Sequence, residues 1–290
     1  MPYPPLKSKS RYLPVRSFAR TETRRHRDFL PLAMHAGHLR AGHSQKEGRH
    51  GDMWYNYLHM NTRLDKNGLR LSPTILINRA VPGSGKTTFA RNIYATMERE
   101  GVSVRVHSTD DYFMVDGRYV FDIRMLGEYH RRNLEAFKAS LAEGIGLVVL
   151  DNTDEHPWET HPYTAAARAA GYRILFMNFL PREFEKHLAA QQVTPEKPDA
   201  HQVPEDSLRQ HIADFLAYND LLKPDAIPDP ARHANYRWDE ENLDLVRLDT
   251  PVIPFDFDDV IVVRPEDYHA LKYKIGEMVL ERMRGYFSNP

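Results

Sequence analysis

The 290-residue sequence contains no cysteine. Disulfide bridges, thiolate metal sites and cysteine nucleophiles are therefore excluded. No apolar run approaches the roughly 18 residues that a membrane-spanning helix needs, so we expect no membrane partner. The lack of cysteine is compatible with a reducing compartment. We expect a cytoplasmic protein, with secretion as an effector and targeting to an organelle left open.

The whole chain has almost no net charge, but its basic and acidic residues are unevenly distributed. Its 39 Lys and Arg residues nearly balance its 40 Asp and Glu residues. Residues 1–70 hold 14 basic and 5 acidic residues, which leaves the rest of the chain acidic. This basic extension, expected to be partly disordered, is either an electrostatic site for a polyanion or a solvated leader.

From residue 71 onward, apolar runs alternate with helical patterns. This order is typical of an α/β fold with a parallel sheet and helices on both faces. We expect a core at 71–222 and a C-terminal extension at 223–290 that adds the last strand and a closing helix. The predicted strands are 74–79, 102–107, 145–150, 172–179 and 258–263. The predicted helices are 86–100, 126–143, 159–170, 182–190, 205–218 and 265–286, with irregular segments at 191–203 and 223–257.

The most informative motif follows the first predicted strand and reads A-V-P-G-S-G-K-T-T, from Ala80 to Thr88. A strand, a glycine-rich turn and a helix opening with Lys-Thr-Thr are the layout of a phosphate-binding loop. Backbone N–H groups and the helix N-terminus attract polyphosphate there. The pattern predicts that ATP is bound by Pro82, Gly83, Ser84, Gly85, Lys86, Thr87 and Thr88.

Within this loop, Lys86 is expected to reach the β- and γ-phosphates, and the Thr87 hydroxyl to bind Mg²⁺. Ala80 stands where the usual pattern has its first glycine. Alanine is tolerated there if the backbone φ angle is negative, and is strained otherwise.

Carboxylates follow two further predicted strands. Asp110 and Asp111 come after the second strand, and Asp151 and Asn152 after the third. In an open parallel sheet, the carboxyl ends of the strands form the mouth of the ligand site. A carboxylate of the first pair could accept a proton from an attacking hydroxyl, although Asp111 taken alone fits a cap of the next turn. Asp151 is expected to hold Mg²⁺, and Asn152 to touch the acceptor or metal-bound water.

Kinases often close an arginine-bearing lid over the γ-phosphate. The natural lid here is 191–203, which contains no arginine. The arginines that could stabilise the transition state instead are Arg131, Arg132, Arg182 and Arg209.

The motifs occur in the order P-G-S-G-K-T-T, S-T-D-D-Y-F-x-x-D-G-x-Y-x-F-D, L-x-x-x-H-x-x-N, V-V-L-D-N-T-D-x-x-P-W-E and H-x-V-P. Over roughly residues 74–220 this set resembles the NEDD4-binding ATPase family, which is similar to phage polynucleotide kinase and to zeta toxins. The resemblance implies a P-loop kinase with a five-stranded parallel sheet, ATP, Mg²⁺ and transfer to a hydroxyl. It also implies that Asp110 is the general base.

The chain departs from that family at several positions. Ala80 replaces a glycine and Asp154 replaces an asparagine. The stretch K-P-D-A directly before His201 lacks the arginine that the family has there. Phe113 stands where phage polynucleotide kinase has an acceptor-binding arginine. The last of these differences counts against a polynucleotide acceptor.

Three functions remain open on the sequence. The first is a kinase acting on the 5′-hydroxyl of a polynucleotide. The second is a zeta-toxin-like kinase acting on a nucleotide sugar or NAD, which the acidic body of the chain favours. The third is an ATP-binding scaffold without useful turnover. We expect an active kinase with a nucleotide-type acceptor, and an inhibitor or antitoxin protein is a candidate partner.

Overall fold

The structure is a computed structural model that describes residues 63–194, 200–239, 244–248 and 252–285. The chain divides into two units, Met1–Glu47 and Gly48–Pro290, and all described residues fall in the second. Most of the predicted basic extension therefore lies outside the described residues. Among those that are described, no helix is long and apolar enough to cross a membrane.

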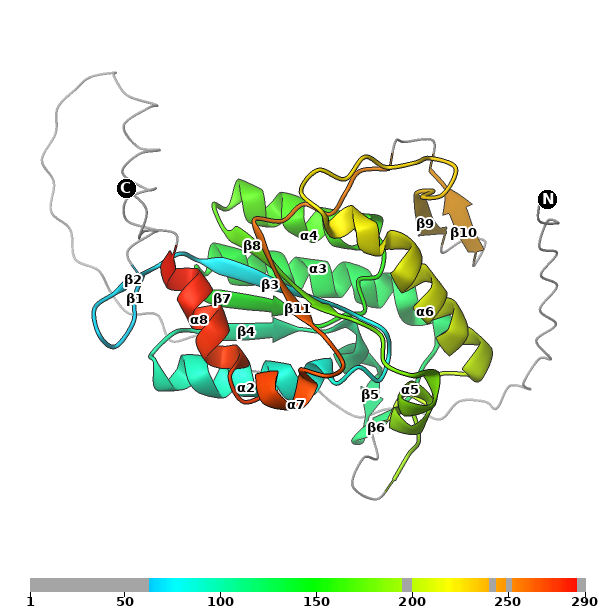
Figure 1. The fold of residues 1–290 in the computed structure, drawn as a ribbon, viewed down its shortest axis with the longest axis horizontal. Helices are drawn as coiled ribbons and strands as arrows, with labels where there is room; N and C mark the ends of the chain where they lie inside the picture. The colour runs from blue at the N-terminus through cyan, green and yellow to red at the C-terminus, as the bar shows by residue number, and fades with distance from the viewer. Residues whose placement is uncertain (1–62, 195–199, 240–243, 249–251, 286–290) are drawn as a thin grey trace, which may run out of the picture. The chain divides into compact units, whose positions relative to one another are not determined.

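A five-stranded sheet forms the centre of the second unit (Figure 1). Its order is β11-β8-β3-β7-β4, and every neighbouring pair is parallel. The strands span Thr74–Ala80 for β3, Val104–His107 for β4, Leu147–Leu150 for β7, Arg173–Phe179 for β8 and Asp259–Val263 for β11. The predicted five-stranded parallel sheet is confirmed. The last strand among the described residues, β11, completes one edge.

The central strand β3 is buried along its whole length. Its side chains alternate between two cores, as the period of a strand requires. Leu76 and Ala80 belong to the core with α2 (Lys86–Arg99) and α8 (Ile275–Gly285). Ile75 and Ile77 belong to the core with α3 (Leu126–Ala142) and α4 (Pro157–Ala169). Figure 1 shows these two helix pairs on opposite sides of the sheet. A strand covered on both faces reads as a continuous apolar run, which is why it was predictable.

Two further helices follow β8. They are α5 (Phe184–Ala190) and α6 (Glu205–Tyr218), and the described residues between them contain no helix. Short 3₁₀ helices occur at η1 (Thr109–Phe113), η2 (Ile123–Met125) and η3 (Asn219–Leu222). Two small antiparallel pairs join β1 (Arg63–Leu64) to β2 (Arg70–Leu71), and β5 (Met114–Val115) to β6 (Arg118–Tyr119).

Two predictions about the C-terminal part were wrong. The single helix predicted at 265–286 is instead α7 (Tyr268–Leu271) and α8, separated by a turn. The turn lets Tyr268 contact Phe89 at the start of α2, while Gly276 packs on Thr96 further along that helix. The segment 223–257, predicted to be irregular, contains a hairpin of β9 (Tyr236–Asp239) and β10 (Asp244–Arg247). Its prolines lie outside the two strands, so they do not interrupt the pairing.

Candidate active site

The turn between β3 and α2 requires glycine at two places. Gly83 and Gly85 have φ angles of 80° and 87°, which side chains rarely adopt. A Cβ at Gly85 would lie 2.1 Å from the Tyr268 hydroxyl, and one at Gly83 would lie 2.8 Å from Gln191 Nε2. Two residues of the loop therefore have left-handed backbone angles, and Tyr268 and Gln191 pack closely against it. This packing restricts the arrangement of the backbone amides.

The replaced glycine causes no strain. Ala80 is the last residue of β3, is fully buried and does not have a positive φ angle. Its N–H donates to the Thr153 carbonyl at 2.8 Å, which ties the start of the loop to the segment after β7.

The remaining loop residues divide by exposure. Pro82 and Ser84 are buried, and the Ser84 hydroxyl donates to the Val81 carbonyl at 2.7 Å. Lys86 opens α2 and is half-buried, whereas Thr87 and Thr88 are exposed in its first turn. Those two hydroxyls are therefore accessible to a ligand.

The far side of the loop is held by residues that sequence reasoning did not select for that purpose. The Arg182 N–H donates to His187 Nε2 at 2.9 Å. His187 therefore carries its proton on Nδ1, which donates to the Pro82 carbonyl at 3.0 Å. Burial lowers the pKa of His187, as this neutral form requires. The Arg182 guanidinium also donates to the Gly83 carbonyl.

The segments after β4 and β7 meet beside the loop. Asn78 on β3 donates its amide to Asp151 Oδ1 at 2.9 Å. The Thr109 N–H donates to Asn152 Oδ1 at 2.9 Å. Both Asp151 and Asn152 are buried. The structure thus brings the predicted metal ligand next to the strand that feeds the phosphate loop, and uses Asn152 to hold η1, which carries Asp110.

Asp110 is contacted on both carboxylate oxygens. The Tyr119 hydroxyl donates to Oδ1 at 2.9 Å, and His201 Nδ1 lies 3.6 Å from Oδ2. Burial and the Asp110 charge raise the pKa of Tyr119, so its hydroxyl stays a donor. Asp110 keeps a side-chain exposure of 40%. It is thus oriented by the protein and open to solvent, which suits a base that must reach a bound hydroxyl.

Two more carboxylates lie in the same electrostatic field. Partial burial, together with Asp151 and Asp110, raises the pKa of Asp111. Burial and Glu159 raise the pKa of Asp154 well above its ordinary value, and the Lys86 ammonium opposes this shift. Asp154 also has a positive φ angle of 48°, a conformation that Asn and Asp adopt more readily than other side chains. This explains how aspartate can stand where the resembling family has asparagine.

A buried arginine supports the loop from behind. Arg79, one residue before Ala80, is fully buried and donates to Asn178 Oδ1 at 3.0 Å and to the carbonyls of Glu155 and Phe215. Burial lowers its pKa to about 9. Its guanidinium carbon lies 3.9 Å from the centre of the Phe215 ring on α6. Arg79 therefore connects β3, the segment after β7 and α6, the helix that follows the predicted lid.

The candidate lid arginines differ in their surroundings. Arg182 lies against the phosphate loop. Arg131 and Arg132 both pair with Glu128 on the exposed surface of α3. Arg209 pairs with Glu205 and stacks on the Phe184 ring at 3.7 Å. Of these predicted residues, the structure brings only Arg182 into contact with the phosphate loop.

Tyr119, His201 and His187 are the main residues of the site that were given no role from the sequence. Tyr119 and His201 do lie within the quoted motifs D-D-Y-F-x-x-D-G-x-Y and H-x-V-P. The motifs were therefore the available signal for both. No local pattern marks His187, because its partner Pro82 is 105 positions away.

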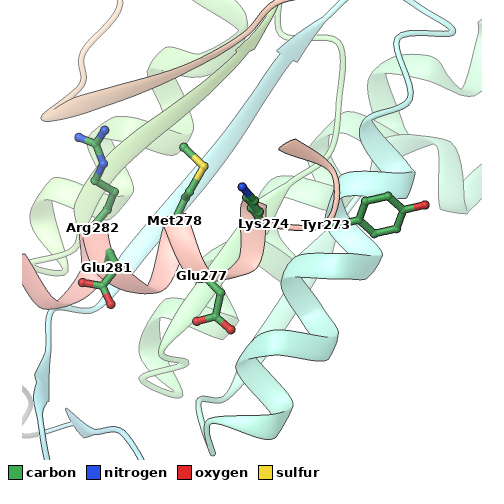
Figure 2. Close-up of a pocket in the computed structure, with 6 residues that line it drawn as sticks. All are labelled: Tyr273, Lys274, Glu277, Met278, Glu281 and Arg282. Atoms are coloured by element: carbon green, nitrogen blue, oxygen red, sulfur yellow. The ribbon is translucent and has the colours of Figure 1, made fainter. Parts of the chain in front are cut away.

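A separate hollow lies along α8, away from these residues (Figure 2). Figure 2 shows Tyr273 pointing away from the other lining residues, and Glu277 and Glu281 pointing away from Met278 and Arg282. Glu277 pairs with Arg99, and Arg282 with Asp259. The side chains diverge and are engaged elsewhere, so this hollow offers no convergent set of catalytic groups.

The donors present fit a magnesium-bound triphosphate. The phosphate loop has two glycines whose φ angles only glycine adopts easily, followed by an ammonium and two exposed hydroxyls at a helix N-terminus. Thr87 and Asp151 offer the hydroxyl and carboxylate oxygens that Mg²⁺ prefers. No cluster of three or more His, Asp or Glu residues suited to a metal occurs among the described residues. A metal here would therefore depend on few protein ligands and on the phosphates.

Comparison with known proteins supports the predicted resemblance. No protein-family model matches the chain. NEDD4-binding protein 2 of Homo sapiens is 35% identical over 118 residues, which are 39% of this chain and 6% of that protein. The resemblance drawn from the motifs is thus confirmed over that segment. The matched part is a small fraction of the human protein.

Several solved structures are similar to this chain. A gluconokinase from Sinorhizobium meliloti 1021 has a TM-score of 0.41 and 15% identity, covering 76% of this chain and 100% of its own. Chaetomium thermophilum Kti12 in complex with ADP-AlF3 has a TM-score of 0.41 and 14% identity, covering 72% and 98%. The Pnkp1/Rnl/Hen1 RNA repair complex has a TM-score of 0.42 and 19% identity, covering 56% and 50%. The substrates of these proteins are not assigned to this chain.

Proposed function

We propose that this protein is an ATP-dependent kinase that transfers the γ-phosphoryl group to a hydroxyl of a nucleotide-type acceptor, with a polynucleotide 5′-hydroxyl as the first candidate. One observation carries the proposal. The glycine loop, Asp151 and the Asp110 segment meet at the carboxyl ends of β3, β7 and β4, joined by the Asn78–Asp151 and Thr109–Asn152 hydrogen bonds. The similarity to NEDD4-binding protein 2 supports it.

Each side chain then has a distinct role. Bound ATP would supply the phosphoryl group, and Mg²⁺ held by Thr87 and Asp151 would offset its charge. Lys86 and the loop amides neutralise and orient the phosphates. Asp110, fixed by Tyr119, accepts the hydroxyl proton as the acceptor oxygen bonds to phosphorus and the bond to the bridging oxygen breaks.

A substrate panel tests the proposal. The protein is incubated with γ-labelled ATP, Mg²⁺ and 5′-hydroxyl DNA, 5′-hydroxyl RNA, UDP-N-acetylglucosamine or NAD. Label on an oligonucleotide supports the polynucleotide acceptor, and label on UDP-N-acetylglucosamine or NAD supports the zeta-toxin-like alternative. No transfer to any acceptor, with ATP still bound, would leave only the scaffold.

The Asp110→Asn variant tests the base. Because asparagine cannot accept the proton, we expect transfer to fall by at least about 100-fold while ATP affinity persists. Asp206→Asn, a change at an exposed position of α6, serves as the matched control and should keep full activity. Undiminished transfer by Asp110→Asn would refute the role given to this carboxylate.

A further inference from the structure

The hairpin that follows η1 presents an unusually apolar surface to solvent. Within ten residues it exposes five large apolar side chains to between 37% and 53%. They are Met114, Val115, Val120, Phe121 and Ile123, here called the hairpin face. Such a concentration of exposed apolar side chains marks a binding surface more often than chance.

The hairpin is anchored firmly enough to act as a surface of fixed shape. Phe113, 2% exposed, contacts the Phe121 ring at 5.1 Å and the Tyr119 ring at 5.8 Å. The Val120 N–H donates to the Phe113 carbonyl at 2.9 Å. The turn at Asp116-Gly117 has the positive φ angles that two-residue hairpin loops use.

This face begins at the candidate base. Tyr119 lies in the hairpin and donates its hydroxyl to Asp110 Oδ1 at 2.9 Å. A molecule lying on the exposed Phe121 ring, next to Tyr119, therefore lies near the carboxylate that would take its proton. Figure 1 shows β5 and β6 beyond the carboxyl ends of β4 and β7.

One face of the Tyr119 ring is covered by a flat nitrogen heterocycle of the protein itself. The His201 imidazole stacks on it with ring centres 4.0 Å apart and an angle of 17° between planes. The Phe121 ring is nearly parallel to Tyr119, at 16°. Stacked heteroaromatic rings are the contact that nucleobases make with aromatic side chains.

Arg118 of the hairpin is exposed on β6, whereas the arginines that follow it in the chain are in ion pairs. Arg124 pairs with Asp122, and Arg131 and Arg132 pair with Glu128. A surface of apolar rings with few unpaired cations favours a flat aromatic group over a run of phosphates.

We propose that the hairpin face binds the acceptor by stacking the base of its terminal nucleoside on the exposed Phe121 ring, next to Tyr119, which places the nucleoside hydroxyl at Asp110. This inference rests on the proposed kinase function and deepens it, because it assigns recognition to the base. A sugar without a base is then a poor acceptor.

Phe121→Ala is the sharpest probe, since Phe121 is exposed and no contact joins it to Asp110. Two acceptors are compared: a short 5′-hydroxyl oligonucleotide and the same oligonucleotide with an abasic 5′-terminal residue. For the unchanged protein, KM should be about 10-fold lower with the base present, as stacking on one aromatic ring allows. Phe121→Ala should remove most of that difference and leave KM for ATP unchanged. Phe121→Trp should restore the difference in KM between the two oligonucleotides. Ile227→Ala, at an exposed apolar side chain outside the hairpin, is the control.

The outcomes separate the two proposals. Transfer to both oligonucleotides with equal KM values, or a difference that survives in Phe121→Ala, overturns the hairpin face as the base site and leaves the kinase assignment standing. No transfer to any member of the substrate panel overturns the kinase assignment, and this inference with it. Circular dichroism of Phe121→Ala confirms that the variant folds.

Discussion

Replacing Gly85 by alanine tests the packing on which the phosphate loop depends. Gly85 has a φ angle of 87°, and its absent Cβ would lie 2.1 Å from the Tyr268 hydroxyl and 2.8 Å from Tyr268 Cζ. Two costs therefore add in the Gly85→Ala variant. One is the left-handed backbone, at about 1–2 kcal/mol. The other is the displacement of Tyr268, at about 1–3 kcal/mol for an overpacked contact.

Gly101 provides a matched control for the backbone cost. Its φ angle is 74°, and a Cβ there would meet nothing within 4 Å. Gly101→Ala should therefore lower the free energy of unfolding by about 1–2 kcal/mol, and Gly85→Ala by about 2–5 kcal/mol. Urea denaturation followed by circular dichroism measures both.

The double variant Gly85→Ala, Tyr268→Ala isolates the clash. Removing the ring should make the added methyl group less costly than it is in the presence of Tyr268, giving a coupling of about 1 kcal/mol or more. Equal losses for Gly85→Ala and Gly101→Ala, together with additive costs in the double variant, would show that Tyr268 does not pack on the loop as described.

Two further predictions concern charge and pH. Lys86→Ala should weaken ATP binding and lower turnover about 100-fold or more, because the loop would lose the ammonium that neutralises the phosphates. Isothermal titration calorimetry and transfer of labelled phosphate measure the two effects, with the surface variant Lys138→Ala as control. Unchanged ATP affinity and turnover would remove the case for a phosphate loop. Burial and the nearby Arg105 lower the pKa of His107 to about 4. Below pH 6.5, His107 binds a proton in the unfolded chain but stays neutral in the folded state. The free energy of unfolding should therefore fall as pH drops from 6.5 toward 4. Urea denaturation should show His107→Gln losing less stability than the unchanged protein between pH 7 and pH 5, by about 2 kcal/mol. Parallel pH profiles would contradict this.

The parts of the fold that could be predicted are those with strong local patterns. Val148 and Val149 lie in an unbroken apolar run because both faces of β7 are buried, each in a different core. The glycine loop was recognisable because its glycines, its lysine and the start of the next helix all fall within the short motif P-G-S-G-K-T-T. The split between α7 and α8 was not, because it depends on how Tyr268 and Gly276 meet α2, far away in the sequence.

The candidate site shows the same division. The sequence placed Asp110 and Asp151 at strand ends, and the topology brings those ends together. It could not reveal that Tyr119 and His201 engage both oxygens of Asp110, since pairings across 9 and 91 positions leave no periodic signal. Nor could it rank the arginines. Arg182 is distinguished from Arg131 only by its contact with Gly83 across 99 positions.

The ion pair between Asp65 and Arg284 links the two ends of the described part of the chain. Arg284 Nε lies 3.0 Å from Asp65 Oδ2, and the Ser72 N–H donates to the Met283 carbonyl at 3.0 Å. Asp65 follows β1 and Arg284 lies in the last turn of α8, so the first and last described elements are tied together near Ser72, just before the amino end of β3. The glycine loop opens at the opposite edge. Breaking this ion pair should therefore loosen the attachment of α8 to the segment before β3, at the end of that strand remote from the glycine loop.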